Sequence, residues 1–126
     1  MPTGEPFTAG QYDEIERTLR KARQDTGLSF SVFVGEPDGE AHGYALKLHA
    51  ALGENAPDSV LVFVAPGSRR LEIVTGRDAR LRLPDPPCGL AALAMASSFS
   101  GGDLAGGIVN GIRMLADAAG RVPSEV

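Results

Sequence analysis

One stretch limits the folds open to this chain more than any other, the segment Asp58-Ser59-Val60-Leu61-Val62-Phe63-Val64-Ala65. It is the only long unbroken run of apolar and β-branched residues in the sequence, with Asn55 and Pro57 before it and Pro66-Gly67-Ser68 after it. A short apolar run between turn residues predicts a strand that is buried on both faces. We therefore expect the remainder of the chain to cover this strand.

Length, composition and charge indicate one soluble domain. The chain has 126 residues, of which 43% are apolar and 22% are charged, ordinary values for a single globular domain. We expect a flexible N-terminal arm at residues 1–7, one domain at residues 8–120 and a C-terminal tail at residues 121–126. The net charge of −4 argues against nucleic acid as a partner, because proteins that bind phosphate backbones carry a basic face.

The sequence also carries signals about location. The first residues lack the positive and apolar regions of a signal peptide, and no apolar segment approaches the ~20 residues that span a bilayer. The single Cys88 cannot form an internal disulfide, which fits a reducing compartment. We expect a cytoplasmic protein, or one soluble piece of a larger protein, with no membrane insertion.

The pattern before the apolar run predicts a βαβ unit. Thr8 and Gln11 form a capping-box pattern at the start of a helix, and Gly27 suits its end. Residues 28–34 predict a strand, and residues 41–52 predict a helix. A strand, a helix and the apolar strand in this order make a crossover with two parallel strands.

The pattern after the apolar run predicts a hairpin and two helices. Turn residues lead into a strand at residues 70–75, which should be antiparallel to the apolar strand, and residues 77–83 predict a short fourth strand. Residues 88–97 predict a helix of Ala, Leu and Met that must be buried or face a partner. The last helix, at residues 104–119, contains Gly106, Gly107 and Gly111, which we interpret as a close approach to a neighbouring element.

Five short pieces of the chain resemble the TPM domain family, which occurs in bacterial membrane-anchored proteins, thylakoid repair proteins and a nematode receptor modulator. The pieces are Tyr44-Ala45-x-x-Leu48, Asp58 to Ala65, Arg69 to Gly76, Leu83-Pro84-Asp85 and Phe99-x-x-x-Asp103-x-x-x-Gly107-Ile108. The resemblance implies a three-layer α/β/α sandwich with a mixed sheet of about four strands and helices on both faces.

The resemblance also implies functions. Some members are credited with acid phosphatase activity or calcium binding, and others are interaction modules. Thr75-Gly76-Arg77-Asp78 replaces the family's Gly-Tyr-Gly turn, and the usual signal peptide and membrane anchor are absent. The chain thus looks like a soluble, divergent bacterial member, and its bias toward Ala, Gly, Arg and Asp resembles that of actinobacterial proteins.

Aspartates are the first candidate site residues. Asp58, Asp78 and Asp103 lie at junctions between loops and elements, where we expect them to meet at one rim of the sheet. Together with loop carbonyls they would suit Ca²⁺ or Mg²⁺, which could orient a phosphate ester and activate water. The alternative is that Asp103 and Asp85 cap helices and Asp58 is a turn residue.

Arginines form a second candidate site. They make a basic strip in an acidic chain, suited to an anionic ligand or an acidic partner surface; its members are Arg69, Arg70, Arg77, Arg80 and Arg82. The alternative is a strand edge that charge protects against aggregation. His42 and His49 are expected at the surface, and Cys88 is expected to be a buried, inert thiol.

Two functional hypotheses follow. The favoured one is a non-catalytic protein-interaction or accessory module, in which the Ala/Leu/Met helix, the last helix or the arginine strip contacts another protein. The alternative is a weak metal-assisted phosphatase or calcium-binding domain that uses Asp58, Asp78 and Asp103. The first is favoured because the family's glycine-rich turn is lost here and no general base stands out in the sequence.

Overall fold

The chain is a mixed α/β domain in the computed structural model, which describes residues 6–121. Most of the predicted arm at residues 1–7 and of the predicted tail at residues 121–126 lies outside the described residues. The elements in chain order are α1 (Ala9–Thr26), β1 (Ser29–Val34), α2 (Ala41–Ala50), the 3₁₀ turn η1 (Gly53–Asp58), β2 (Ser59–Ala65), β3 (Arg70–Thr75), the 3₁₀ turn η2 (Ala79–Leu81), α3 (Asp85–Ser100) and α4 (Leu104–Ala119). Among the described residues, none of the helices has the length and apolar character needed to span a membrane.

The apolar run is the central strand of the sheet, as predicted. The strand order is β1-β2-β3, with β1 parallel and β3 antiparallel to β2. Every residue of β2 is buried, because the strand has neighbours on both edges and helices over both faces. The predicted crossover and hairpin pairings are therefore confirmed.

The predicted fourth strand at residues 77–83 is wrong, and the sheet formed within residues 6–121 has three strands. This segment turns instead, because the amide of Asp78 donates to the Pro57 carbonyl oxygen at 2.9 Å and the amide of Leu83 donates to that of Ala79 at 2.9 Å. Ala79 and Leu83 are buried four positions apart while Leu81 is 83% exposed, which is helical and not strand periodicity. The segment crosses the end of the sheet to reach α3.

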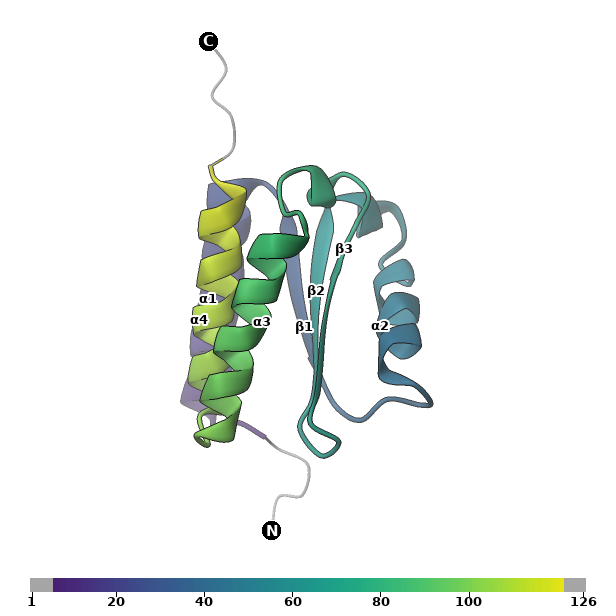
Figure 1. Cartoon of the computed structure of the whole chain (residues 1–126). Helices are drawn as coiled ribbons and strands as arrows, with labels where there is room; N and C mark the ends of the chain where they lie inside the picture. Colours follow the sequence, from purple (N-terminus) through teal and green to yellow (C-terminus); the bar gives the residue numbers. More distant parts are fainter. Residues whose placement is uncertain (1–5, 122–126) are drawn as a thin grey trace.

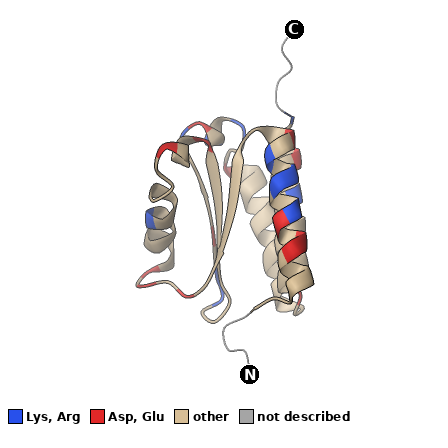
Figure 2. Ribbon diagram, turned by 180° about the vertical axis from the view of Figure 1, so that it is seen from behind, with Lys and Arg blue, Asp and Glu red and all other residues tan. Residues whose placement is uncertain are grey.

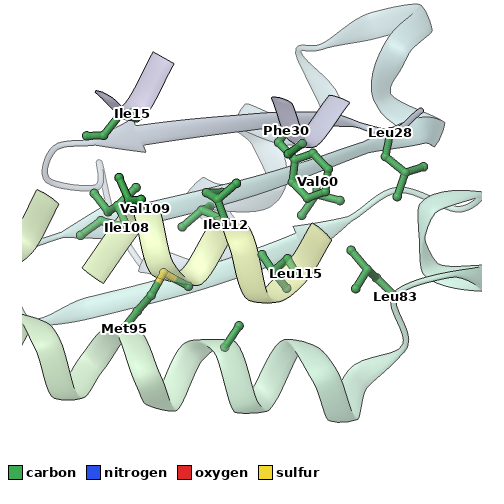
Figure 3. Packing of buried hydrophobic residues seen from close by; sticks show 14 of the residues in the cluster. Ile15, Leu28, Phe30, Val60, Leu83, Met95, Ile108, Val109, Ile112 and Leu115 are labelled. Carbon is green, nitrogen blue, oxygen red and sulfur yellow. The ribbon is translucent and has the colours of Figure 1, made fainter. Parts of the chain in front are cut away.

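The helices lie on both sides of the sheet. Figure 1 shows α2 on one side and α1, α3 and α4 on the other. The smaller apolar cluster lies under α2 and contains Phe63 and Val74. The larger cluster lies on the other side, and Figure 3 shows the side chains of Val60, Met95 and Ile112 gathered within it.

Two glycines of α4 allow α3 to pack closely against it. A Cβ atom at Gly107 would lie 2.8 Å from the Ser98 Cβ atom, and a Cβ atom at Gly111 would lie 2.5 Å from the Met95 Cγ atom. Both distances are too short for real carbon atoms. The predicted close approach of the last helix to a neighbouring element is confirmed, and the neighbour is α3.

Candidate functional site

The structure brings two of the three candidate metal-ligating aspartates to one end of the sheet and the third to the other end. Asp58 ends η1, and the amide of Asp78 donates to the carbonyl oxygen of the preceding Pro57 at 2.9 Å. Asp103 precedes α4 at the end of the sheet where β2 finishes, since Val64 and Leu104 line the same cavity. The expected meeting of all three at one rim does not occur.

Two of the three aspartates interact with neighbouring residues in the chain. The Asp103 carboxylate accepts a hydrogen bond from the Gly106 amide at 2.9 Å and caps α4, which was the alternative interpretation. The Asp78 carboxylate lies 3.6 Å from the Arg77 guanidinium. Within residues 6–121 there is no group of three or more His, Cys, Asp or Glu residues that could hold a metal ion. Binding of Ca²⁺ or Mg²⁺ stays a prediction.

The arginine strip is divided between the two ends of β3. Arg69 and Arg70 lie at the β2–β3 turn, whereas Arg77 and Arg80 follow the other end of the strand, about 17 Å away at the usual rise per residue. Arg80 donates to the Thr75 carbonyl oxygen at 3.2 Å. The two groups cannot hold one small anion together.

Arg82 has a structural role that the sequence did not reveal. Its guanidinium donates to the carbonyl oxygens of Thr26 at 2.6 Å, Ala119 at 3.2 Å and Gly120 at 2.8 Å. These carbonyls end α1 and α4, whose last turns lack intrahelical partners for them. Arg82 therefore ties together the ends of two helices that are far apart in sequence.

Both histidines of α2 contact the sheet. The Nδ1 atom of His42 lies 2.8 Å from the Glu72 Oε1 atom, and this hydrogen bond raises the pKa of His42. The Nε2 atom of His49 lies 3.1 Å from the Ser59 carbonyl oxygen. The two rings therefore contact separate parts of the sheet instead of sharing a metal. The His42 side chain is 59% exposed, in line with the predicted surface position.

Cys88 is a half-buried thiol at the start of α3. Its sulfur lies 3.8 Å from the Leu83 carbonyl oxygen, and burial raises its pKa. A raised pKa lowers the fraction of thiolate, which is the nucleophilic form. The environment of Cys88 is thus that of an unreactive thiol.

The most unusual surface of the domain belongs to α3. Leu90 is 62% exposed and Leu93 is 70% exposed, although Ala91 and Met95 on the opposite face are fully buried. We call the exposed, uncharged face of this helix the α3 surface; it consists of Gly89, Leu90, Leu93, Ala96, Ser97 and Ser100. The sequence predicted a helix that is buried or faces a partner, and the structure leaves this face uncovered by the described residues.

A cavity of about 440 Å³ lies at the end of the α3 surface. It opens between the β2–β3 turn, the last part of α3 and the start of α4, and its apolar lining includes Leu71, Phe99 and Leu104. Its volume lies within the range of small-ligand sites, roughly 300–1,000 Å³. The sequence did not reveal this cavity, because its walls come from the β2–β3 turn and from the α3–α4 region, which are far apart in sequence.

Arg69 contributes to the wall of this cavity. Its φ of 56° places it in the left-handed region, which a side chain other than glycine occupies at a cost of about 1–2 kcal/mol. Its amide donates to the Pro66 carbonyl oxygen at 3.2 Å and closes the turn. Within the described residues its guanidinium has no hydrogen-bond or ion-pair partner. Arg70 lines the same cavity, which thus combines an apolar wall with two cationic residues.

Comparison with known families gives one match over most of the chain. A family model described as "Domain of unknown function (DUF5130)" matches residues 1–116. The predicted resemblance to the TPM domain family is wrong, because the family that matches is this one. The five short pieces mark turns, helix starts and a buried strand, features that many α/β domains share.

Solved structures with this fold come from several bacteria. The BA42 protein of Bizionia argentinensis superposes with a TM-score of 0.84 at 18% identity, over 97% of this chain and 89% of that one. The N-terminal domain of a P. gingivalis protein gives a TM-score of 0.80 at 20% identity, over 92% of this chain and 78% of that one. The N-terminal domain of cg2496 from Corynebacterium glutamicum gives 0.78 at 16% identity, over 99% and 81%. At these identities the likeness concerns the fold alone.

Proposed function

This chain belongs to the DUF5130 family, a domain of unknown function, and we propose that it is a non-catalytic interaction module that binds a partner protein through the α3 surface. In this proposal the domain is a three-layer α/β/α sandwich whose outer helix α3 presents the contact face. The partner contributes an apolar segment with an acidic residue at one end. The apolar part lies along α3, and the acidic residue lies near Arg69 at the cavity.

The observation that carries the proposal is the exposure of Leu90 and Leu93 on a helix without charges between Asp85 and Asp103. A surface helix usually covers its solvent face with charged residues, and α1 of this domain does so. Burying each leucine against a partner would stabilise the complex by up to about 1.5–3 kcal/mol. An uncharged face also avoids the cost of removing charges from water on binding.

The cavity supports the choice of partner. Leu93, Ala96 and Ser100 follow one another at spacings of three and four residues, so they lie on one stripe of the helix. Ala96 and Ser100 also line the cavity, which therefore continues the α3 surface. Arg69 supplies a positive charge at this end, and a carboxylate matches a guanidinium in shape and charge.

We do not propose the alternative, a metal-assisted phosphatase or calcium-binding domain. That function needs Asp58, Asp78 and Asp103 at one site, and Asp103 lies at the opposite end of the sheet. No other observation favours it.

The test has two stages. A photo-crosslinking residue at Ser97 should capture a partner in the native host that the same residue at Lys47, on α2, does not capture. The captured protein is then purified, and its dissociation constant is measured with the wild type and with variants. The double variant Leu90→Gln/Leu93→Gln should weaken binding about a hundredfold, because each leucine loses roughly 1.4 kcal/mol of apolar contact and each such loss is tenfold.

Matched variants separate the contribution of the α3 surface to binding from the general effect of replacing an exposed leucine. Leu46 on α2 is 46% exposed, and Leu46→Gln should leave the affinity unchanged. Arg69→Glu should weaken binding through charge repulsion. The proposal is refuted if the Leu90/Leu93 variant, folded by circular dichroism, binds the partner as tightly as the wild type. Turnover of a generic phosphate ester with Mg²⁺ that is lost in Asp58→Asn and Asp103→Asn would refute the non-catalytic assignment.

A further inference from the structure

We infer that the chain forms a homodimer in which the open edge of β1 pairs with the β1 strand of a second copy in antiparallel orientation. This contact is separate from the α3 surface. It extends the sheet across a two-fold axis and joins the α1 helices of the two copies.

The backbone of β1 is arranged for such pairing. β1 is an edge strand, and the Gly35 amide donates to the Val64 carbonyl oxygen on β2 at 2.9 Å. In a parallel ladder the groups that face the neighbour alternate along the strand. The amides and carbonyls of Phe30, Val32 and Val34 therefore point away from β2, and none of them bonds to another backbone group in the described part of the chain.

The strand β1 itself has none of the protective residues that edge strands usually carry, although the Arg23 side chain of α1 donates to the Ser29 hydroxyl at its start. Its sequence, Ser29 to Val34, has no charged residue and no proline. The opposite edge strand, β3, carries Arg70 and Glu72. Charges and prolines at an edge prevent pairing with another chain, so their absence from β1 marks the edge that is open to strand addition.

The helix beside β1 favours a second copy as the partner. α1 packs against β1, and residues Glu16, Arg20 and Arg23 line one hollow together with Ser29 and Ser31 of the strand. Figure 2 shows acidic residues towards the start of α1 and basic residues towards its end, with two exceptions. Arg17 pairs with Asp13 at 2.5 Å, and Asp25 lies 3.1 Å from Lys21. The charged stripe beside the strand is thus acidic at one end and basic at the other.

This stripe is complementary to itself in the antiparallel arrangement. Asp13, Glu16, Arg20 and Arg23 follow one another at spacings of three and four residues. In the inferred dimer Val32 lies opposite Val32 of the second copy, and the two-fold axis passes α1 near residue 18, so that Glu16 faces Arg20 of the second copy. Asp13 and Arg23 have partners within one copy, Arg17 and the Ser29 hydroxyl, so the charge contact across the axis depends on Glu16 and Arg20. The same register places Phe30 opposite Val34 and gives about six hydrogen bonds between the strands. An unrelated extended peptide would make the strand contact but not the charge contact.

The experiment measures the dissociation constant of the dimer by sedimentation equilibrium over a wide range of protein concentration. The single variants Glu16→Arg and Arg20→Glu should each weaken the dimer about tenfold, because each creates two like-charge contacts. The double variant Glu16→Arg/Arg20→Glu should restore the dimer, because the opposite charges are exchanged across the axis. A residue with only a structural role inside one copy would not show this rescue.

Two further measurements test the strand. Ser31→Lys should abolish the dimer without unfolding the monomer, because a lysine on an edge opposes strand pairing. Hydrogen exchange should show the amides of Phe30, Val32 and Val34 to be protected in the dimer and unprotected at dilutions where the chain is monomeric. A wild type that is monomeric at all concentrations, or a dimer that the charge variants leave unchanged, would overturn the inference. A dimer that Leu90→Gln/Leu93→Gln dissociates would also overturn it, since the α3 surface would then be the contact.

Discussion

Replacing Gly107 by alanine tests the close packing of α3 against α4. In an isolated helix this change would be stabilising by about 1 kcal/mol, because alanine has the higher helix propensity. In this domain the added methyl group would lie 2.8 Å from both the Ser98 Cβ atom and the Phe99 Cε1 atom. The Ser98 Cβ atom is attached directly to the backbone of α3, so it cannot move unless the helix moves.

The expected result is a loss of stability. Inserting a methyl group into a closely packed contact costs about 1–3 kcal/mol, which offsets or exceeds the gain in propensity. Gly89→Ala is the matched control, since it makes the same change in α3 at a position where a Cβ atom meets nothing within 4 Å. It should stabilise the domain by about 0.5–1 kcal/mol.

The assay is urea unfolding followed by circular dichroism at equal protein concentration. Both variants gain the same helix propensity, so the difference between their free energies of unfolding gives the packing cost alone. Gly107→Ala should therefore be less stable than Gly89→Ala by about 1–3 kcal/mol. Equal slopes of free energy against urea would show that the unfolded states are comparable. If both variants are stabilised to the same extent, the close α3–α4 contact inferred from these glycines is absent.

Two further predictions concern polar contacts. Because the hydrogen bond to Glu72 raises the pKa of His42, the pair should stabilise the fold below the ordinary value of 6.5 and lose this effect as the pH rises through the raised pKa. An NMR titration of the His42 ring should show a pKa above 6.5 that falls in Glu72→Gln, and an unchanged value in that variant would contradict the assignment. Arg82→Ala should lower the free energy of unfolding by about 1–3 kcal/mol, because it leaves the carbonyls at the ends of α1 and α4 without their charged donor. The control Arg77→Ala, at a side chain that is 81% exposed, should change stability by less than about 0.5 kcal/mol, and an equal loss in both variants would argue against the Arg82 network.

The segment after β3 shows why one strand was predicted in error. Residues 77–83 alternate in polarity, and a run of this length does not distinguish a strand from a 3₁₀ turn. The outcome depends on whether a partner strand exists. Here the amides of the segment bond to Pro57, Gly76 and Ala79 instead.

For the candidate site, too, the sequence predicted one part and the tertiary structure decided the rest. The composition of α3 was sufficient to predict a helix that is buried or faces a partner, and the structure leaves Leu90 and Leu93 of this helix exposed. The cavity beside it was not predictable, since Leu71, Phe99 and Leu104 meet only after the chain has folded. The expected meeting of Asp58, Asp78 and Asp103 at one rim does not occur, because residues at junctions of elements can lie at either end of a sheet.

The sequence by itself determined the local features of this protein. The apolar run dictated a central buried strand, Thr8 and Gln11 set the start of α1, and the turn at residues 66–69 set the hairpin. These depend on neighbouring residues, whose spacing and backbone preferences act over a few positions.

The tertiary structure alone decided which distant groups meet. It placed Asp103 away from Asp58 and brought Arg82 to the ends of two helices. Within the described residues it also left β1 without a strand on its outer edge and the face of α3 uncovered. Such contacts depend on the direction in which each element crosses the sheet. That direction is set by the packing of the whole core and not by any short stretch of the chain.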